Sequence, residues 1–170
     1  MNKYLKLSDV DSSNLLKAKS KIRKLLKKKL HYIYTEKAID PVIDHLTFKM
    51  DSTTYNLQMT FEYNEKYCDV LCFISPTVVS ENSYIDTLRL VNSINWNVKA
   101  MGRYYIDDYK DVAYSLRLDY ELLEKQEDRF LQEIETAIKY YEDVFMLILN
   151  VSLGKFGYDK AYAELNSMWN

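Results

Sequence analysis

The chain has 170 residues, 48% of them hydrophobic and 28% charged, with 3 Gly and 2 Pro. This composition excludes a disordered chain and predicts one domain over residues 1–170. The net charge is −2, but residues 1–40 hold 11 Lys and Arg against 4 Asp and Glu, whereas residues 41–170 hold 12 against 21. The longest apolar run, at 144–149, is far shorter than the about 20 residues that cross a bilayer. With two Cys and no apolar export signal, the chain is expected to be cytoplasmic.

The first predicted element is a basic amphipathic helix that begins near residue 12. Apolar residues recur at helical spacing from Leu15 to Ile33, and Asp40-Pro41 closes the segment because a residue before Pro avoids the helical region. Lys29 falls inside the apolar arc, where only a snorkelling or paired Lys is tolerated. The opposite arc is a candidate basic contact face, made of Lys17, Lys21, Arg23, Lys24, Lys27 and Lys28.

This basic arc has two interpretations. It could follow phosphates or lie on anionic lipid. Alternatively, it is a solvated face or contacts acidic protein surface, of this chain or of another. The second interpretation is preferred because the rest of the chain is acidic and would repel phosphate. We therefore do not expect nucleic acid or a membrane as the partner.

A three-stranded antiparallel meander follows, because the apolar period changes from 3.6 to 2. Strict alternation runs over 55–63, and 67–74 is apolar on both faces, which predicts a central strand. Ser75-Pro76 is expected to end this sheet segment. Cys68 and Cys72 lie about 13 Å apart on such a strand, too far for a disulfide or a shared metal ion. We expect both to be small core residues.

The second half predicts helix, two strands and helix. Ser80 is expected to cap a helix whose buried stripe would be Tyr84, Ile85, Leu88, Val91 and Ile94. Strands over 98–106 and 112–120, joined by a polar turn, precede one long helix over about 121–150 and a short helix over 158–169. The order α-β-β-β-α-β-β-α, plus the C-terminal helix, predicts an α+β domain with helices packed on an antiparallel sheet.

No arrangement of residues predicts catalysis. There are two His, no nucleophile motif and no Gly-rich loop after a strand. Asp107, Asp108 and Asp111 lack the spacing, central Gly and final Glu of a calcium loop and are interpreted as a turn. We therefore expect no enzyme activity, no metal and no cofactor.

Tyrosine is abundant, with 16 copies. Adjacent tyrosines such as Tyr104-Tyr105 cannot both face one core, and exposed Tyr is enriched at interfaces. The stretch 144–149 is apolar all round, which predicts a homodimer. The candidate self-association surface is Phe145, Leu149, Tyr158, Tyr162 and Trp169. In a monomer, the last helix must instead fold back over Phe145 and Leu149.

Two passages together resemble the YbjN-like family, described as bacterial sensory transduction regulators. They are 88–95, which holds N-x-x-N as Asn92 and Asn95, and Gly102-Arg103-Tyr104-Tyr105-Ile106-Asp107 with the strand at 112–118. Both Asn suit the sharp turn from helix to strand and are expected to be structural, as is Gly102. The resemblance covers about 12–150 and leaves 151–170 as an extension.

The resemblance implies a fold similar to that of type III secretion chaperones, small homodimers that bind extended segments of other proteins. It therefore implies a non-enzymatic, protein-binding role with another polypeptide as the partner. Two alternatives stay open. One is a regulator that contacts nucleic acid or a membrane through the basic helix, and the other is an immunity or inhibitor protein whose acidic body suits a basic target.

Overall fold

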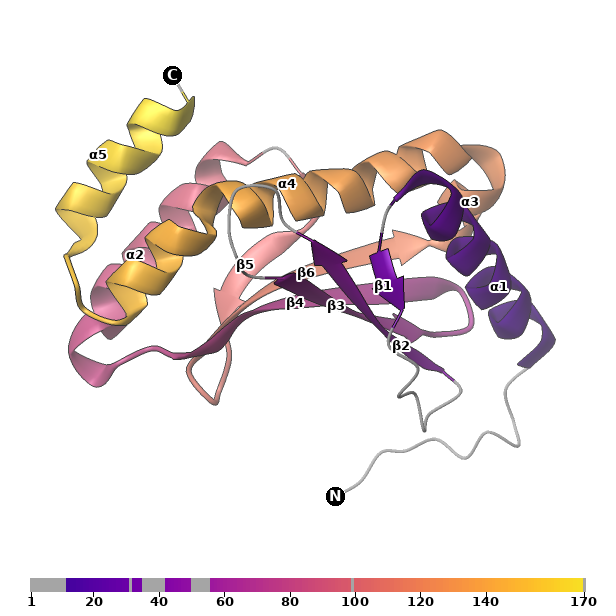
Figure 1. Ribbon diagram of the computed structural model, residues 1–170, viewed down its shortest axis with the longest axis horizontal. Helices are drawn as coiled ribbons and strands as arrows, with labels where there is room; N and C mark the ends of the chain where they lie inside the picture. Colours follow the sequence, from indigo (N-terminus) through magenta and orange to yellow (C-terminus); the bar gives the residue numbers. More distant parts are fainter. Residues whose placement is uncertain (1–11, 31, 35–41, 50–55, 99, 170) are drawn as a thin grey trace.

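The fold is that of a computed structural model, which describes residues 12–30, 32–34, 42–49, 56–98 and 100–169. Its elements are labelled in Figure 1. They follow in the order α1 (Ser12–Lys29), β1 (Tyr32–Tyr34), β2 (Ile43–Lys49), β3 (Asn56–Tyr63), β4 (Tyr67–Val78), the 3₁₀ turn η1 (Glu81–Ser83), α2 (Tyr84–Asn97), β5 (Arg103–Ile106), β6 (Asp111–Asp119), α3 (Tyr120–Lys125), α4 (Glu127–Ser152) and α5 (Tyr158–Trp169).

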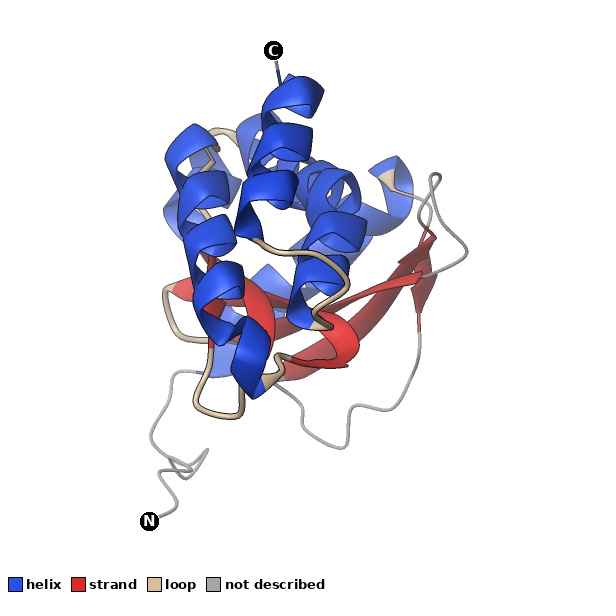
Figure 2. Ribbon diagram, turned by 90° about the vertical axis from the view of Figure 1, so that its left-hand side faces the viewer, coloured by secondary structure: helices blue, strands red, loops and turns tan. Residues whose placement is uncertain are grey.

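The strands form one antiparallel sheet in the order β1-β2-β3-β4-β6-β5. All described helices lie on one side of this sheet, so its other face is left bare by the described elements (Figure 2). The predicted α+β class, with helices packed on an antiparallel sheet, is confirmed. β4 occupies the central position that its apolar sequence predicts.

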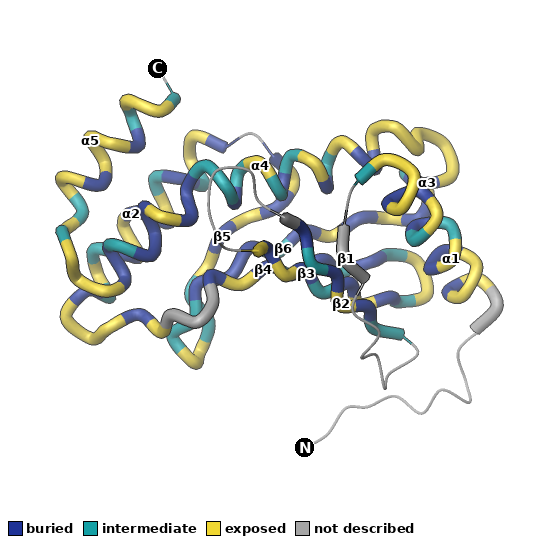
Figure 3. Tube along the Cα trace, viewed as in Figure 1, coloured by how far each residue is buried: buried dark blue, intermediate teal, exposed yellow. Residues whose placement is uncertain are grey.

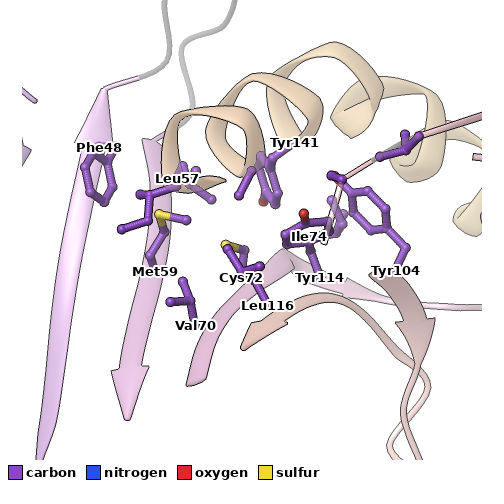
Figure 4. Packing of buried hydrophobic residues seen from close by; sticks show 14 of the residues in the cluster. Phe48, Leu57, Met59, Val70, Cys72, Ile74, Tyr104, Tyr114, Leu116 and Tyr141 are labelled. Atoms are coloured by element: carbon purple, nitrogen blue, oxygen red, sulfur yellow. The ribbon is translucent and has the colours of Figure 1, made fainter. Parts of the chain in front are cut away.

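A single hydrophobic core fills the space between helices and sheet. Alternation along β3 buries every second side chain, as predicted, and buried and exposed residues also alternate along α1, α2 and α4 (Figure 3). Figure 4 shows Tyr141 of α4 above Cys72 and Ile74 of β4, close to Tyr104 and Tyr114 of β5 and β6. The rings of Tyr104 and Tyr114 meet edge to face at 5.0 Å.

Both cysteines are free and buried, as predicted from their places on one strand. Burial raises the pKa of the Cys68 and Cys72 thiols, so neither is a reactive thiolate at neutral pH.

Two boundaries in the first half differ from the prediction. The first helix ends at Lys29, and Tyr32–Tyr34 forms β1, whose Ile33 pairs with Thr47 of β2. Ile33 therefore does not belong to the helical arc. The segment Tyr32–Tyr34 consists of β-branched and aromatic residues, which favour a strand over a helix. β4 also continues past Pro76 to Val78. A shift in register between Phe73 and Val78 makes this possible, since a bulge tolerates the proline that a regular ladder rejects.

Two further differences lie in the second half. The predicted helix over 121–150 is two helices, α3 and α4, separated at Gln126, where φ is −144° and ψ is 65°. The predicted strand over 98–106 is shortened to Arg103–Ile106. Ser80 precedes η1 rather than α2, and its side chain bonds the Ser83 hydroxyl at 2.8 Å instead of capping the helix.

Candidate functional site

Two residues of the predicted basic face bind carboxylate or carbonyl oxygens of their own chain. Lys21 Nζ donates to the Leu123 carbonyl at the end of α3 (3.0 Å) and lies 3.5 Å from Glu127 at the start of α4. Arg23 forms a bidentate ion pair with Asp44 of β2. The Lys21 contact supports the interpretation that the arc meets acidic surface of its own chain, because a cation is stabilised near a helix C-terminus and an exposed carboxylate. Arg23 instead binds a buried carboxylate.

The other four members of that face, Lys17, Lys24, Lys27 and Lys28, are exposed. None of them has a hydrogen bond or ion pair with another residue in the described part of the chain. The basic face is therefore divided: Lys21 and Arg23 connect α1 to α3, α4 and β2, whereas the other four side chains are in solvent.

Asp44 is the centre of a buried ionic cluster that sequence reasoning missed. Its side chain is 0% exposed and accepts from Arg23, from the Tyr63 hydroxyl at 2.9 Å and from Lys19 at 3.2 Å. Lys19 also donates to the Ile43 carbonyl (3.3 Å). Burial raises the pKa of Asp44, but the hydrogen bonds from Arg23, Tyr63 and Lys19 outweigh it and hold the pKa below the usual value. A carboxylate satisfied in this way anchors α1 to the sheet.

The helical spacing of α1 could have predicted that Lys19 is buried and therefore needs an acidic partner. Lys19 stands four residues after Leu15 and three before Ile22, both buried, so it lies on the same side of α1. Lys29, the residue that the apolar arc singled out, is exposed because the helix ends there.

Asn95 fixes the turn from α2 into β5, in the structural role expected for N-x-x-N. Its carboxamide donates to the Tyr104 carbonyl (2.8 Å) and accepts from the Tyr104 amide (2.9 Å). These backbone groups point away from β6, because alternate residues of an antiparallel strand face opposite edges. Asn95 therefore closes part of the exposed edge of β5 against strand addition. Asn92 is exposed and has no such bond with a described residue.

Gly102 is required by the packing of Tyr114. It is buried, and a Cβ at this position would overlap the Tyr114 ring.

We expect Gly102→Ala to lower the free energy of unfolding by about 1–3 kcal/mol, because an overpacked core must shift side chains or backbone. Urea denaturation followed by circular dichroism measures the loss. Gly157→Ala is the matched control: its Cβ would meet Asp86 Oδ2 at 2.8 Å, the end of a half-buried side chain that can rotate away. Equal losses in the two variants would contradict the assigned role of Tyr114.

The predicted self-association surface is only partly accessible. Phe145 is 1% and Leu149 9% exposed in the single chain, so both are core residues here. α5 folds back against α2 and α4 of its own chain. Its Tyr158 hydroxyl lies 2.9 Å from the Ser93 hydroxyl, and Trp169 meets Tyr140 edge to face at 6.2 Å. α5 therefore packs on its own chain, and the homodimer stays a prediction.

The outer side of α2 carries apolar residues that sequence reasoning had placed inside. Ile85 is 63% exposed and Leu88 is also exposed, which corrects the predicted stripe. The buried side is instead Thr87, Leu90, Val91 and Ile94. α2 is apolar over much of its circumference, so periodicity alone could not select the side that faces the core. Trp96, which no motif marked, is 87% exposed on the same outer side.

The bare face of the sheet carries a second apolar group. Ala113 of β6 pairs with Phe73 of β4 on one side and with Tyr105 of β5 on the other. Phe73 and Tyr105 are exposed, whereas Tyr104 is buried, so the two adjacent tyrosines divide between the faces as predicted. We call Leu71, Phe73, Tyr105 and Ala113 the open-face cluster. Beside it, Arg117 binds Asp69 at 2.8 and 3.1 Å and stacks on Tyr67.

Comparisons of the chain with protein-family models, with curated proteins and with solved structures gave no match. Among the described residues, no three or more His, Cys, Asp or Glu converge as a metal site would require. No described helix combines the length and apolarity that a membrane crossing demands.

A cleft of about 470 Å³ lies between α1, the β3–β4 turn and α3. The described residues that line it include three Lys and four acidic side chains, and none of them is His, Cys or Ser. The cleft is therefore a charged groove, and its described lining does not supply the pair of a nucleophile and an activating base that covalent catalysis uses.

Proposed function

We propose that this chain is a non-enzymatic, cytoplasmic domain that binds an extended segment of another polypeptide on the bare face of its sheet. Between α1 and α2 the structure has the three expected strands β2, β3 and β4, preceded by the short additional β1, and two strands lie between α2 and α3. Apart from β1, this order agrees with the one that the resemblance to the YbjN-like family and to type III secretion chaperones implies. That resemblance supports a binding role. It is the only support that comes from outside the chain.

The observation that carries the proposal is the open-face cluster. A solvated sheet face is normally polar, and β3 follows this rule with Asn56, Gln58 and Glu62. The neighbouring strands depart from it, since Phe73 and Tyr105 present two exposed rings on either side of the small Ala113. Ala113 itself is 0% exposed, so the accessible apolar surface here is that of the two aromatic residues. Aromatic residues are enriched at protein interfaces.

Binding on this face is favoured over strand addition at the β5 edge of the sheet. β5 has only four residues, and Asn95 occupies the outward backbone groups of Tyr104. A partner that paired with this edge would have to displace both hydrogen bonds. A partner on the bare face has no such obstacle, and its apolar side chains would cover the exposed parts of Phe73 and Tyr105, which are 37% and 38% exposed.

The test compares the wild type with the double variant Phe73→Ser, Tyr105→Ser. Tagged proteins are used to capture partners from the source cells, and the polypeptide that the wild type retains is then purified and titrated calorimetrically. We expect the double variant to bind it at least about tenfold more weakly, because aromatic residues are enriched among the interface residues whose truncation costs more than about 1 kcal/mol. Tyr109→Ser, at the exposed β5–β6 turn, is the control and should bind like the wild type.

Equal affinity of the purified partner for the wild type and the double variant would refute the open face as the binding site. Turnover of a substrate by the purified chain would refute the non-enzymatic role.

A further inference from the structure

The bare face of the sheet has a charged half beside the open-face cluster (Figure 2). Glu62 of β3 lies opposite Asp69 of β4, and Asp69 lies opposite Arg117 of β6. Residues paired across an antiparallel sheet point to the same face, and so does Asp119, two residues after Arg117 on β6. The neighbours of these residues along each strand are buried against the helices. We call Glu62, Asp69, Arg117 and Asp119 the charged half.

The charged half has an excess of negative charge. Its three carboxylates and one guanidinium give a net charge of −2. Arg117 is already engaged, because it forms its ion pair with Asp69 and stacks on Tyr67. Glu62 and Asp119 are exposed, and neither has an ion pair with another residue in the described part of the chain. The fold therefore leaves two carboxylates of this face in water.

The described cation nearest to the cluster on this face does not balance them. Arg103 of β5 lies two residues before Tyr105, but its guanidinium donates to the Ala100 and Gly102 carbonyls and is directed toward the connection between α2 and β5. Asp111, two residues before Ala113 on β6, adds a further carboxylate. A partner on the bare face therefore gains ion pairs by bringing positive charge and is repelled if it brings negative charge.

The spacing between the two halves suits an extended segment. Asp69 and Phe73 are four residues apart on β4, with Leu71 between them on the same face. At about 3.3 Å per residue this separation is about 13 Å. In an extended partner, side chains four positions apart also point to one side and are equally far apart. One partner side chain can therefore cover Phe73 and Tyr105 while another reaches Glu62.

We propose that the polypeptide segment bound on the bare face is basic: it places an apolar side chain on the open-face cluster and a Lys or Arg about four residues away, over the charged half. This inference rests on the proposed function, because it assigns the chemistry of the partner at the same face. The apolar contact supplies buried area. The ion pairs with Glu62 and Asp119 select the basic segment and fix its register.

Selection from random peptides tests this chemistry before the natural partner is known. Peptides of about 12 residues, about 40 Å long when extended, are displayed on phage and selected on the immobilised wild type. We expect the enriched sequences to share an apolar residue and a Lys or Arg four positions away. Synthetic copies are then titrated against the double variant Phe73→Ser, Tyr105→Ser. Peptides that occupy the open face should lose at least about tenfold in affinity.

Exchange of charge between the two partners tests the ionic contact. The titrations are made at about 0.15 M salt, where exposed charges beyond about 8 Å are screened. Glu62→Lys should bind an enriched peptide at least about threefold more weakly, because attraction becomes repulsion. The same peptide with Glu in place of its Lys or Arg should bind Glu62→Lys more tightly than it binds the wild type. Glu65→Lys is the matched control: Glu65 is exposed but lines the cleft beside α1, so binding should be unchanged.

The outcomes separate this inference from the proposed function. If no enriched peptide depends on Phe73 and Tyr105, the bare face is not the binding site and both proposals are refuted. If the peptides depend on these two residues but show no preference for Lys or Arg, or if the charge exchange restores no affinity, the proposed function stands and the basic partner is refuted.

Discussion

Replacing Asp44 by Asn is expected to lower the free energy of unfolding by about 3–5 kcal/mol, the usual loss when one partner of a buried ion pair is removed. Lys19 would keep its charge in a site where its side chain is only 9% exposed, and Arg23 and the Tyr63 hydroxyl would lose their anionic acceptor. Urea denaturation at pH 7 measures the loss. The control is Glu121→Gln, which breaks an exposed pair with Lys125 and should cause no measurable change.

Removing the buried cation as well should recover part of that loss. Asp44→Asn combined with Lys19→Met leaves no uncompensated buried charge at this site, because Arg23 is partly exposed and can turn to solvent. The double variant is therefore expected to be more stable than Asp44→Asn alone. Additive losses in the two single variants would show that Lys19 and Asp44 do not interact.

The same cluster predicts acid sensitivity. The pKa of Asp44 is lowered in the folded chain relative to an ordinary value of about 3.9. Its contribution to stability is therefore complete above that ordinary value and is lost as the pH falls through the lower, folded-state pKa. The free energy of unfolding of the wild type should fall with pH in this acid range. In Asp44→Asn the part of this pH dependence that Asp44 contributes should be absent. If the free energy of unfolding changed with pH equally in the wild type and in Asp44→Asn, Asp44 would not be the cause of the acid sensitivity.

Elements with one clear period could be predicted from the sequence. β3 alternates strictly and faces the core on one side, so neither its type nor its orientation was ambiguous. The arc of α1 from Leu15 to Leu26 is likewise buried as expected. The fold class follows from the order of such elements and from the lengths of their connections, which are local properties.

What could not be predicted depends on contacts between distant residues. Asp44 pairs with Lys19, 25 positions away, and nothing local to either residue indicates the other. The orientation of α2 is decided by α4, α5 and β5, which pack against it, so Ile85 and Leu88 face outward although their pattern suits either side. Tyr104-Tyr105 shows the limit of local reasoning: adjacency predicted that one ring is exposed, but only the sheet order places Tyr105 beside Ala113 and Phe73.

Replacing Phe145 by Ala is expected to lower the free energy of unfolding by about 3–5 kcal/mol, the cost of truncating a fully buried aromatic side chain. Phe145 is 1% exposed and stacks on Tyr141 with ring centres 5.4 Å apart. Because this burial occurs within one chain, the loss should stay the same over a tenfold range of protein concentration, and the variant should keep the mass of the wild type. Tyr162→Ala, exposed on α5, should have a far smaller effect. If Phe145 were instead an interface residue, its loss would depend on concentration and the variant would dissociate, which would restore the C-terminal region as the dimer contact.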